Sequence, residues 1–134
     1  MKCLIIDDEV FSREVVVSLL KDVAECDEAA DGSEAIAKFR SAMVTDTPYD
    51  LIILDIMMPE MSGHETAKAI RALEKEHRLE IGKRVKIVML TALNSPQDAM
   101  DSFCSAQSAA YIVKPVSREN LFNIISKLGL MKKK

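Results

Sequence analysis

The stretch YDLIILDIMMPEMSG, residues 49–63, decides the fold class of this chain. Its apolar run at 51–54 is typical of a buried strand, and the strand ends in a carboxylate, Asp55. An Asp at a strand end is often only a turn former. A functional role for Asp55 therefore requires other polar groups at the same edge of the sheet, and the rest of the chain decides between these two interpretations.

Short apolar runs of this kind alternate with helical patterns along the chain. The expected strands cover residues 2–6, 25–29, 50–55, 85–90 and 109–113. Helices are expected over residues 10–23, from a cap at Asp31, from Ser62 to about residue 77, from Ser95 and from Ser117. Strands this apolar are covered on both faces, which predicts a doubly wound α/β fold with a five-stranded parallel sheet and helices on both sides. The charged connection at 74–84 is interpreted as a solvated surface loop.

The composition limits the class of protein. A length of 134 residues fits one domain, residues 1–134, and 49% hydrophobic residues are enough for a sizeable core. A net charge of −3 argues against direct nucleic-acid binding, which usually needs a basic surface. The cysteines Cys3, Cys26 and Cys104 are far apart, so neither a disulfide framework nor a zinc site is indicated. No apolar run is long enough for a signal peptide or a membrane span, and we expect a cytoplasmic protein.

Polar residues follow most of the expected strands, at the edge where ligands bind in such sheets. The first strand ends in Asp7 and Asp8, the third in Asp55, the fourth in Thr91 and the fifth in Lys114. Three adjacent carboxylates favour a bound cation, and a set of oxygen ligands without His or Cys favours Mg²⁺. An ammonium and a hydroxyl beside that cation suit the oxygens of a transferring phosphoryl group. Asp55 is the best candidate nucleophile because it lies on the central strand, and its product would be an acyl phosphate.

Four motifs occur in this order: LIIDDE (4–9), YDLIILDIMMPEMSG (49–63), VMLTA (88–92) and YIVKP (111–115). Together they make the chain resemble the receiver domains of response regulators, the CheY-like group, along nearly its whole length. The resemblance implies a flavodoxin-like fold with strand order 2-1-3-4-5. It also implies two-component or phosphorelay signalling by a domain that is phosphorylated and switches partner binding, and not an enzyme with a substrate of its own.

The resemblance assigns a role to each acidic residue. Asp55 matches the phosphoacceptor, which takes its phosphoryl group from a phosphohistidine and also contacts the metal. Asp8 matches a direct Mg²⁺ ligand and Asp7 a ligand that acts largely through water. Met57 would contribute its backbone carbonyl to the same Mg²⁺ ion, so its apolar side chain is no objection.

The resemblance also assigns a switch. Thr91 matches the hydroxyl residue that moves to meet the phosphoryl group, and Lys114 matches its ion-pair partner. Tyr111 matches the aromatic residue whose inward rotation accompanies that movement. Pro115 follows Lys114 as in the family, where this peptide bond is usually cis.

The loop after Asp55 carries further expectations. Pro59 and Gly63 are interpreted as shaping this loop by turn chemistry. Met57 and Leu93 occupy the two positions that tune acyl-phosphate hydrolysis in the family, and both are apolar here. Neither can orient an attacking water by hydrogen bonding, so we predict slow self-dephosphorylation unless both are simply packing residues.

Three functions from different classes remain open at this stage. The first is a stand-alone receiver with no output domain. Its donor would be a sensor histidine kinase or a histidine phosphotransfer protein, its target an unidentified downstream protein, and no nucleic acid or membrane would take part. A homodimer through the fourth and fifth helical faces is compatible with the family.

The second function is that of a Mg²⁺-dependent small-molecule phosphohydrolase with Asp55 as nucleophile, which would need a general acid and a covering lid. The third is a metal-independent binding module that retains the fold alone.

Overall fold

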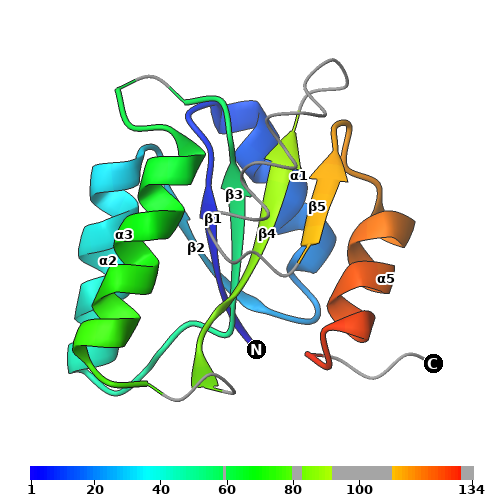
Figure 1. Ribbon diagram of the computed structural model, residues 1–134. Coiled ribbons are helices and arrows are strands. Elements are labelled where there is room, and N and C mark those ends of the chain that lie inside the picture. The colour runs from blue at the N-terminus through cyan, green and yellow to red at the C-terminus, as the bar shows by residue number, and fades with distance from the viewer. Residues whose placement is uncertain (59, 80–82, 92–109, 131–134) are drawn as a thin grey trace.

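The computed structural model describes residues 1–58, 60–79, 83–91 and 110–130 (Figure 1). The strands are β1 (Lys2–Ile6), β2 (Glu25–Ala29), β3 (Leu51–Asp55), β4 (Lys86–Thr91) and β5 (Ala110–Val113). The helices in the described residues are α1 (Val10–Leu20), α2 (Gly32–Val44), α3 (Gly63–Glu76) and α5 (Arg118–Lys127). The predicted helix from Ser95 lies outside the described residues, as do Pro59 and Leu93.

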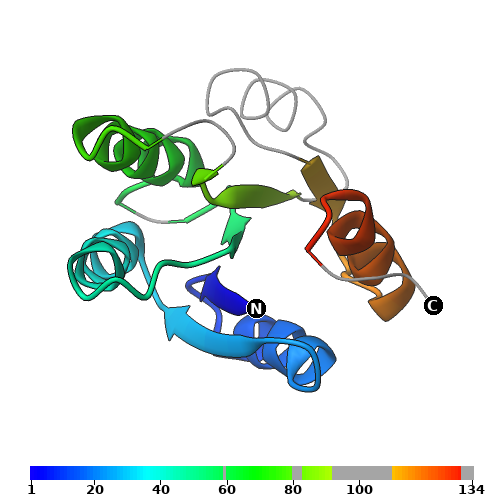
Figure 2. The ribbon, with the colours of Figure 1, turned by 90° about the horizontal axis from the view of Figure 1, so that it is seen from below.

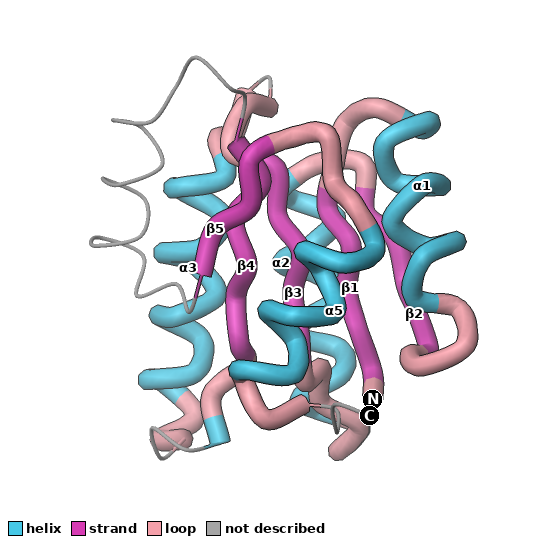
Figure 3. Tube along the Cα trace, turned by 90° about the vertical axis from the view of Figure 1, so that its right-hand side faces the viewer, coloured by secondary structure: helices cyan, strands magenta, loops and turns pink. Residues whose placement is uncertain are grey.

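The five strands form one parallel sheet in the order β2-β1-β3-β4-β5, which confirms the predicted fold and strand order. Helices α2 and α3 cover one face of the sheet, and α1 and α5 cover the other (Figures 1 and 2). Figure 3 looks onto the face that α1 and α5 cover. The central position of β3 places its last residue, Asp55, between the ends of its neighbours β1 and β4.

The strand β3 is apolar throughout because both of its faces are buried. Ile52 and Leu54 belong to the core cluster under α2 and α3. Leu51 and Ile53 belong to the opposite cluster, under α1 and α5. Since successive side chains of a strand point to opposite faces, burial on both sides requires an unbroken apolar run, as the sequence shows.

Side-chain caps begin three of the described helices where the sequence predicts them. Asp31 accepts a hydrogen bond from the Glu34 amide at 2.8 Å at the start of α2. Ser62 and Glu65 form a reciprocal capping box at α3. The Ser117 hydroxyl accepts a hydrogen bond from the backbone N–H of residue 120 at 3.1 Å at the start of α5.

The prediction for α1 is too long by three residues. The helix ends at Leu20, and its last carbonyl accepts hydrogen bonds from the amides of both Val23 and Ala24 in the following turn. Val23 still packs against the core beneath α1. Its apolar side chain therefore continues the helical pattern in sequence although the backbone has already turned.

The interpretation of 74–84 as a solvated loop is wrong at its beginning. Residues 74–76 belong to α3, and Glu74 is fully buried. Its carboxylate accepts hydrogen bonds from the Arg71 guanidinium and from the Val85 amide, each at 2.6 Å. A buried charge that is paired in this way fixes the end of α3 to the start of β4.

Candidate functional site

The carboxyl edge of the sheet gathers the polar residues that the sequence places at its strand ends. Asp7 follows β1, Asp55 ends β3, Thr91 ends β4 and Lys114 follows β5. The Lys114 amide donates a hydrogen bond to the Thr91 carbonyl at 2.8 Å, which extends the pairing of β4 with β5 to the site itself. The parallel arrangement of the strands therefore brings these side chains to one edge of the sheet.

Asp7, Asp8 and Asp55 form an acidic cluster. Each offers one carboxylate oxygen, and these three oxygens lie within 4.8 Å of one another. Asp7 and Asp55 retain 1% and 4% of their accessible surface, whereas Asp8 is exposed. A compact set of hard oxygen donors with one open side fits a Mg²⁺ ion, which binds through few carboxylates and keeps several waters.

Lys114 lies between the two buried carboxylates. Its Nζ is 3.3 Å from Asp7 Oδ2 and 3.4 Å from Asp55 Oδ2. Burial alone would lower the pKa of the ammonium, but the charges of Asp55 and Asp7 outweigh that effect and raise the pKa. Lys114 is therefore held in its charged form against the acidic cluster.

The Asp55 carboxyl has a pKa raised from 3.8 to about 6. Burial is the largest cause, and the neighbouring charge of Asp7 adds to it. The Lys114 charge and the Met57 amide, which donates to Asp55 Oδ1 at 3.3 Å, act in the opposite direction. The ammonium thus compensates only part of the repulsion in the cluster, which leaves a site that attracts a further cation.

Gly63 allows α3 to begin directly against the end of β3. A Cβ atom at this position would lie 2.5 Å from the Asp55 carbonyl oxygen and 2.7 Å from the Ile56 Cα. The Gly63 amide donates to the Ile56 carbonyl at 3.0 Å, which fixes this close approach. Gly63 thus shapes the loop after Asp55, as predicted, and glycine is required there because a Cβ atom would clash with the backbone at the end of β3.

The other predicted residues lie at or near the same edge. Thr91 is buried, Tyr111 of β5 is exposed, and the Lys114–Pro115 peptide bond is cis as expected from the resemblance. The Met57 side chain is 62% exposed, so it projects toward solvent beside the acidic cluster and does not fill the core.

Arg13 supports the site and was not predicted. Its guanidinium donates to the Asp7 carbonyl at 2.7 Å and pairs with Glu28 at 3.2 Å. Arg13 thereby ties α1 and β2 to the backbone that carries Asp7. The sequence gives no signal for this role, because an arginine in the first turns of a helix is an ordinary surface residue.

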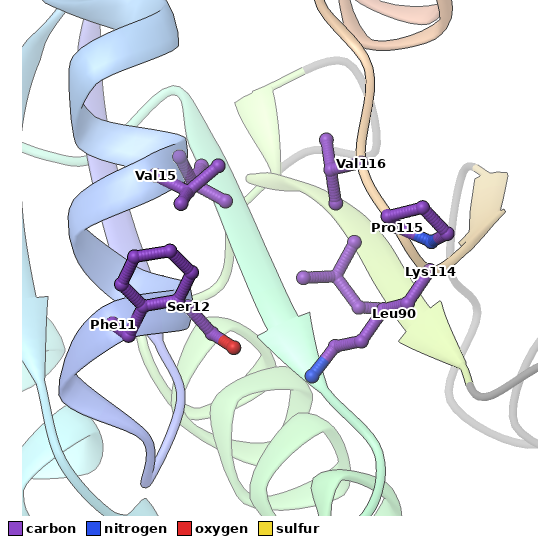
Figure 4. Close-up of a pocket in the computed structure, with 8 residues that line it drawn as sticks. Phe11, Ser12, Val15, Leu90, Lys114, Pro115 and Val116 are labelled. Atoms are coloured by element: carbon purple, nitrogen blue, oxygen red, sulfur yellow. The ribbon is translucent and has the colours of Figure 1, made fainter.

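A cavity of about 410 Å³ lies beside Lys114, between the first turns of α1 and the segment after β5 (Figure 4). Phe11, Ser12 and Val15 line it on the α1 side, and Pro115 and Val116 line it on the other. The Phe11 side chain is 76% exposed. An apolar surface therefore lies directly next to the acidic cluster and its lysine.

Comparison with known proteins identifies relatives in signalling. Residues 3–126 match the response regulator receiver domain family. The two-component response regulator ORR41 of Oryza sativa subsp. japonica is 33% identical over 135 residues, which cover 97% of this chain and 95% of the relative. The hybrid signal transduction histidine kinase L of Dictyostelium discoideum is 33% identical over 129 residues, 96% of this chain but 7% of the kinase. The chain therefore corresponds to nearly all of one relative and to a small part of the other.

A solved structure shows the same architecture. It is the co-crystal structure of the Saccharomyces cerevisiae histidine phosphotransfer signaling protein Ypd1 and the receiver domain of its downstream response regulator Ssk1. The similarity has a TM-score of 0.80 at 29% identity and covers 98% of this chain and 90% of that chain. Within the described parts of the present chain, no helix combines the length and apolar character needed to cross a membrane.

Proposed function

This chain belongs to the response regulator receiver domain family of two-component phosphorelay signalling, and on that premise we propose that Asp55 is its phosphoacceptor in a Mg²⁺-dependent reaction. The observation that carries the proposal is the arrangement of charges at the sheet edge. Three carboxylate oxygens lie within 4.8 Å of one another, and the Lys114 Nζ is within 3.4 Å of two of the carboxylates. One nucleophile, a cation site and a fixed ammonium are thus assembled around a single point.

Each residue then has a defined task in the transfer. An ionised Asp55 oxygen attacks the phosphorus of a phosphohistidine, the new P–O bond forms as the P–N bond breaks, and the histidine leaves with the electron pair. Asp7, Asp8, Asp55 and the backbone carbonyl of Met57 would hold Mg²⁺, which supplies positive charge to the phosphoryl oxygens. Lys114 adds a second positive charge from the other side, and its carboxylate contacts hold it in position for that role.

Thr91 and Tyr111 would couple phosphorylation of Asp55 to a change in the surface of the protein. Thr91 ends β4, the strand next to β3 and Asp55, and its hydroxyl would bond to an added phosphoryl group. Tyr111 is exposed on the neighbouring strand β5, and it lines a surface hollow together with Val113 and Asn120 of the β5–α5 face. A shift of Thr91 toward the phosphoryl group frees space near β5, and an inward rotation of Tyr111 would then alter what this face binds.

The phosphodonor is a protein that carries a phosphohistidine on a helical surface, and it docks on the apolar surface next to the site. Exposed Phe11 and the cavity beside it border Lys114, whose Nζ is 3.4 Å from Asp55 Oδ2, so a partner seated there lies close to the acceptor. The related receiver domain in the yeast co-crystal structure is paired with a histidine phosphotransfer protein. A receiver that works in this way modifies only itself and has no substrate to turn over.

Acetyl phosphate with Mg²⁺ tests the acceptor. Intact mass should show one added phosphoryl group on the wild type and none on Asp55→Asn. The matched control is Asp50→Asn, at the amino end of the same strand region, where the side chain accepts a hydrogen bond from the Lys2 amide at 2.8 Å. Asp50→Asn should label like the wild type. Labelling of Asp55→Asn to the same extent as the wild type would refute Asp55 as the phosphoacceptor. Continuous release of phosphate without a stable adduct would favour the phosphohydrolase alternative.

Replacement of Phe11 tests the docking surface separately. Phe11→Ser should slow phosphoryl transfer from a histidine phosphotransfer protein by about fivefold to thirtyfold, since an exposed aromatic residue in an interface often carries about 1–2 kcal/mol of binding energy. Labelling by acetyl phosphate should not change, because a small donor needs no docking surface. Equal slowing with both donors would show that the substitution disturbs the site and not the docking.

A further inference from the structure

Two cysteines that are far apart in sequence lie directly opposite each other in the sheet. Cys3 of β1 is the register partner of Cys26 of β2. Both side chains belong to the apolar cluster on the α1 side, where Cys3 is fully buried and Cys26 is partly exposed. Both are free thiols, and the Cys26 thiol donates a hydrogen bond to the Ala24 carbonyl at 3.9 Å. The structure thus forms a dithiol pair that the sequence does not indicate.

The strand geometry is compatible with a covalent link. Neighbouring strands lie roughly 4.7–4.9 Å apart, and disulfides join residues whose Cα atoms are about 4.4–6.8 Å apart. β2 is the edge strand of the sheet, with β1 as its only strand neighbour in the described residues. A small movement of β2 toward β1 would therefore disturb no second strand pairing.

We propose that Cys3 and Cys26 are a reversible redox modification site, at which a peroxide converts the two thiols into a β1–β2 disulfide. The partly exposed Cys26 is the thiol that meets the peroxide, and the buried Cys3 is the thiol that resolves the product. This site is separate from Asp55 and does not depend on the function proposed for it.

The reaction balances in two steps. The Cys26 sulfur attacks one peroxide oxygen, an S–O bond forms, the O–O bond breaks, and the leaving oxygen takes the thiol proton as water. The Cys3 sulfur then attacks the Cys26 sulfur, an S–S bond forms, the S–O bond breaks, and a second water leaves with the Cys3 proton. Two thiols are oxidised and one hydrogen peroxide is reduced to two waters.

The surroundings assign these two roles in this order. The neighbouring Cys3 thiol lowers the pKa of the Cys26 thiol, against the opposing effects of burial and of Asp27. The neighbouring Cys26 thiol, together with burial, raises the pKa of Cys3. Since the thiolate is the reactive form, Cys26 is both the more accessible and the more nucleophilic thiol.

The disulfide would leave the phosphoryl site intact. Cys3 is at the amino-terminal end of β1, and Asp7 follows the opposite end, roughly 13 Å away at the usual rise per residue. The link would fasten the edge strand and enclose α1 in a covalent loop. We therefore expect labelling of Asp55 by acetyl phosphate to stay within about twofold of the reduced protein.

A full-length Cys104→Ser variant isolates the pair. After treatment with hydrogen peroxide in native buffer, alkylation in denaturant should leave both cysteines unmodified, with a mass loss of about 2 Da. Dithiothreitol should restore two alkylation sites, and a peptide map should join the segments that contain Cys3 and Cys26. The matched control adds Cys26→Ser, which should keep one alkylatable Cys3 and show no loss of that mass.

A second probe tests the spacing of the thiols without oxidation. Phenylarsine oxide, which bridges two close thiols, should bind the Cys104→Ser variant in a one-to-one ratio and should not bind after Cys26→Ser is added. Two outcomes contradict the proposal: over-oxidation of Cys26 while Cys3 stays alkylatable, or a disulfide only between two copies of the chain.

Discussion

Replacement of the Asp55 carboxyl, the proposed phosphoacceptor, should stabilise the fold. Asp55 is 4% exposed, and burial together with the charge of Asp7 raises its pKa from 3.8 to about 6. A raised pKa in a carboxyl means that the folded state disfavours the ionised form. Asp55→Asn keeps the shape and an oxygen to accept the Met57 hydrogen bond, but it removes the charge. The variant should therefore unfold at higher denaturant concentration than the wild type in Mg²⁺-free buffer.

The magnitude follows from the change in pKa. A shift from 3.8 to about 6 corresponds to about 3 kcal/mol of unfavourable interaction when Asp55 is ionised. Lys114 loses one of its two carboxylate partners in the variant, which offsets part of this gain. We therefore expect Asp55→Asn to raise the free energy of unfolding by about 1–3 kcal/mol at pH 7.5.

The pH dependence separates this explanation from better packing. Between pH 3.8 and about 6, the folded wild type holds a proton that the unfolded chain has released, so its stability falls as the pH rises through this window. Asn does not ionise, and the other acids contribute to both proteins. The stability difference should therefore be largest above pH 6 and should shrink toward pH 4.

Urea unfolding at pH 7.5 and 4.5 with a chelator measures both effects. Asp22→Asn, a charge removal at an exposed turn, should change the unfolding free energy by less than about 0.5 kcal/mol at either pH. Added Mg²⁺ should narrow the gap between wild type and Asp55→Asn at pH 7.5, because bound cation relieves the repulsion in the wild type. A variant that is less stable than the wild type at pH 7.5, or equally stabilised at both pH values, would refute this reasoning.

Four other substitutions test separate parts of the site. Gly63→Ala should lower the free energy of unfolding by about 2–4 kcal/mol in urea titrations, since its Cβ would lie 2.5 Å from the Asp55 carbonyl oxygen. Unchanged stability would mean that α3 can move away freely. Lys114→Met should raise the pKa of the Asp55 carboxyl above about 6 in a carbon NMR titration, because the ammonium lowers it in the wild type; a lower pKa would contradict this. Met57→Asn and Leu93→Glu should each shorten the phosphoryl lifetime, and unchanged lifetimes in both would contradict a role of these two positions in hydrolysis.

The apolar runs predict the strands well, because a strand that is buried on both faces needs apolar residues at successive positions. The run that ends at Asp55 indicates a strand wherever it is placed in the sheet. The apolar pattern does not indicate the order of the strands, since any of several orders would bury the same residues. Here the order came from the resemblance of whole motifs, and the pairing of β1 with both β2 and β3 confirms it.

Other features depend on distances that sequence alone cannot provide. Glu74 looks like one more charge in a polar segment, but its burial follows from the position of the Val85 amide across a connection. Glycine is required at position 63 because the end of β3 leaves no room for a Cβ atom, and not because of a turn conformation. Cys3 and Cys26 become neighbours only through the register of β1 with β2. In each case the role of the residue depends on a contact between two segments of the chain, and no sequence pattern indicates that these segments meet.

The charges at the sheet edge explain why one divalent cation and one phosphoryl group suit the same place. The three carboxylates of the acidic cluster and the one ammonium of Lys114 give a net charge of −2 when all are ionised. A Mg²⁺ ion would bring this to zero, which leaves Asp55 ionised and able to attack. On the proposed function, transfer to Asp55 would replace the single carboxylate charge by a phosphoryl group that carries about two negative charges. The added charge would lie near Lys114 and Thr91 and would attract these two residues, whereas it would repel the other carboxylates of the acidic cluster.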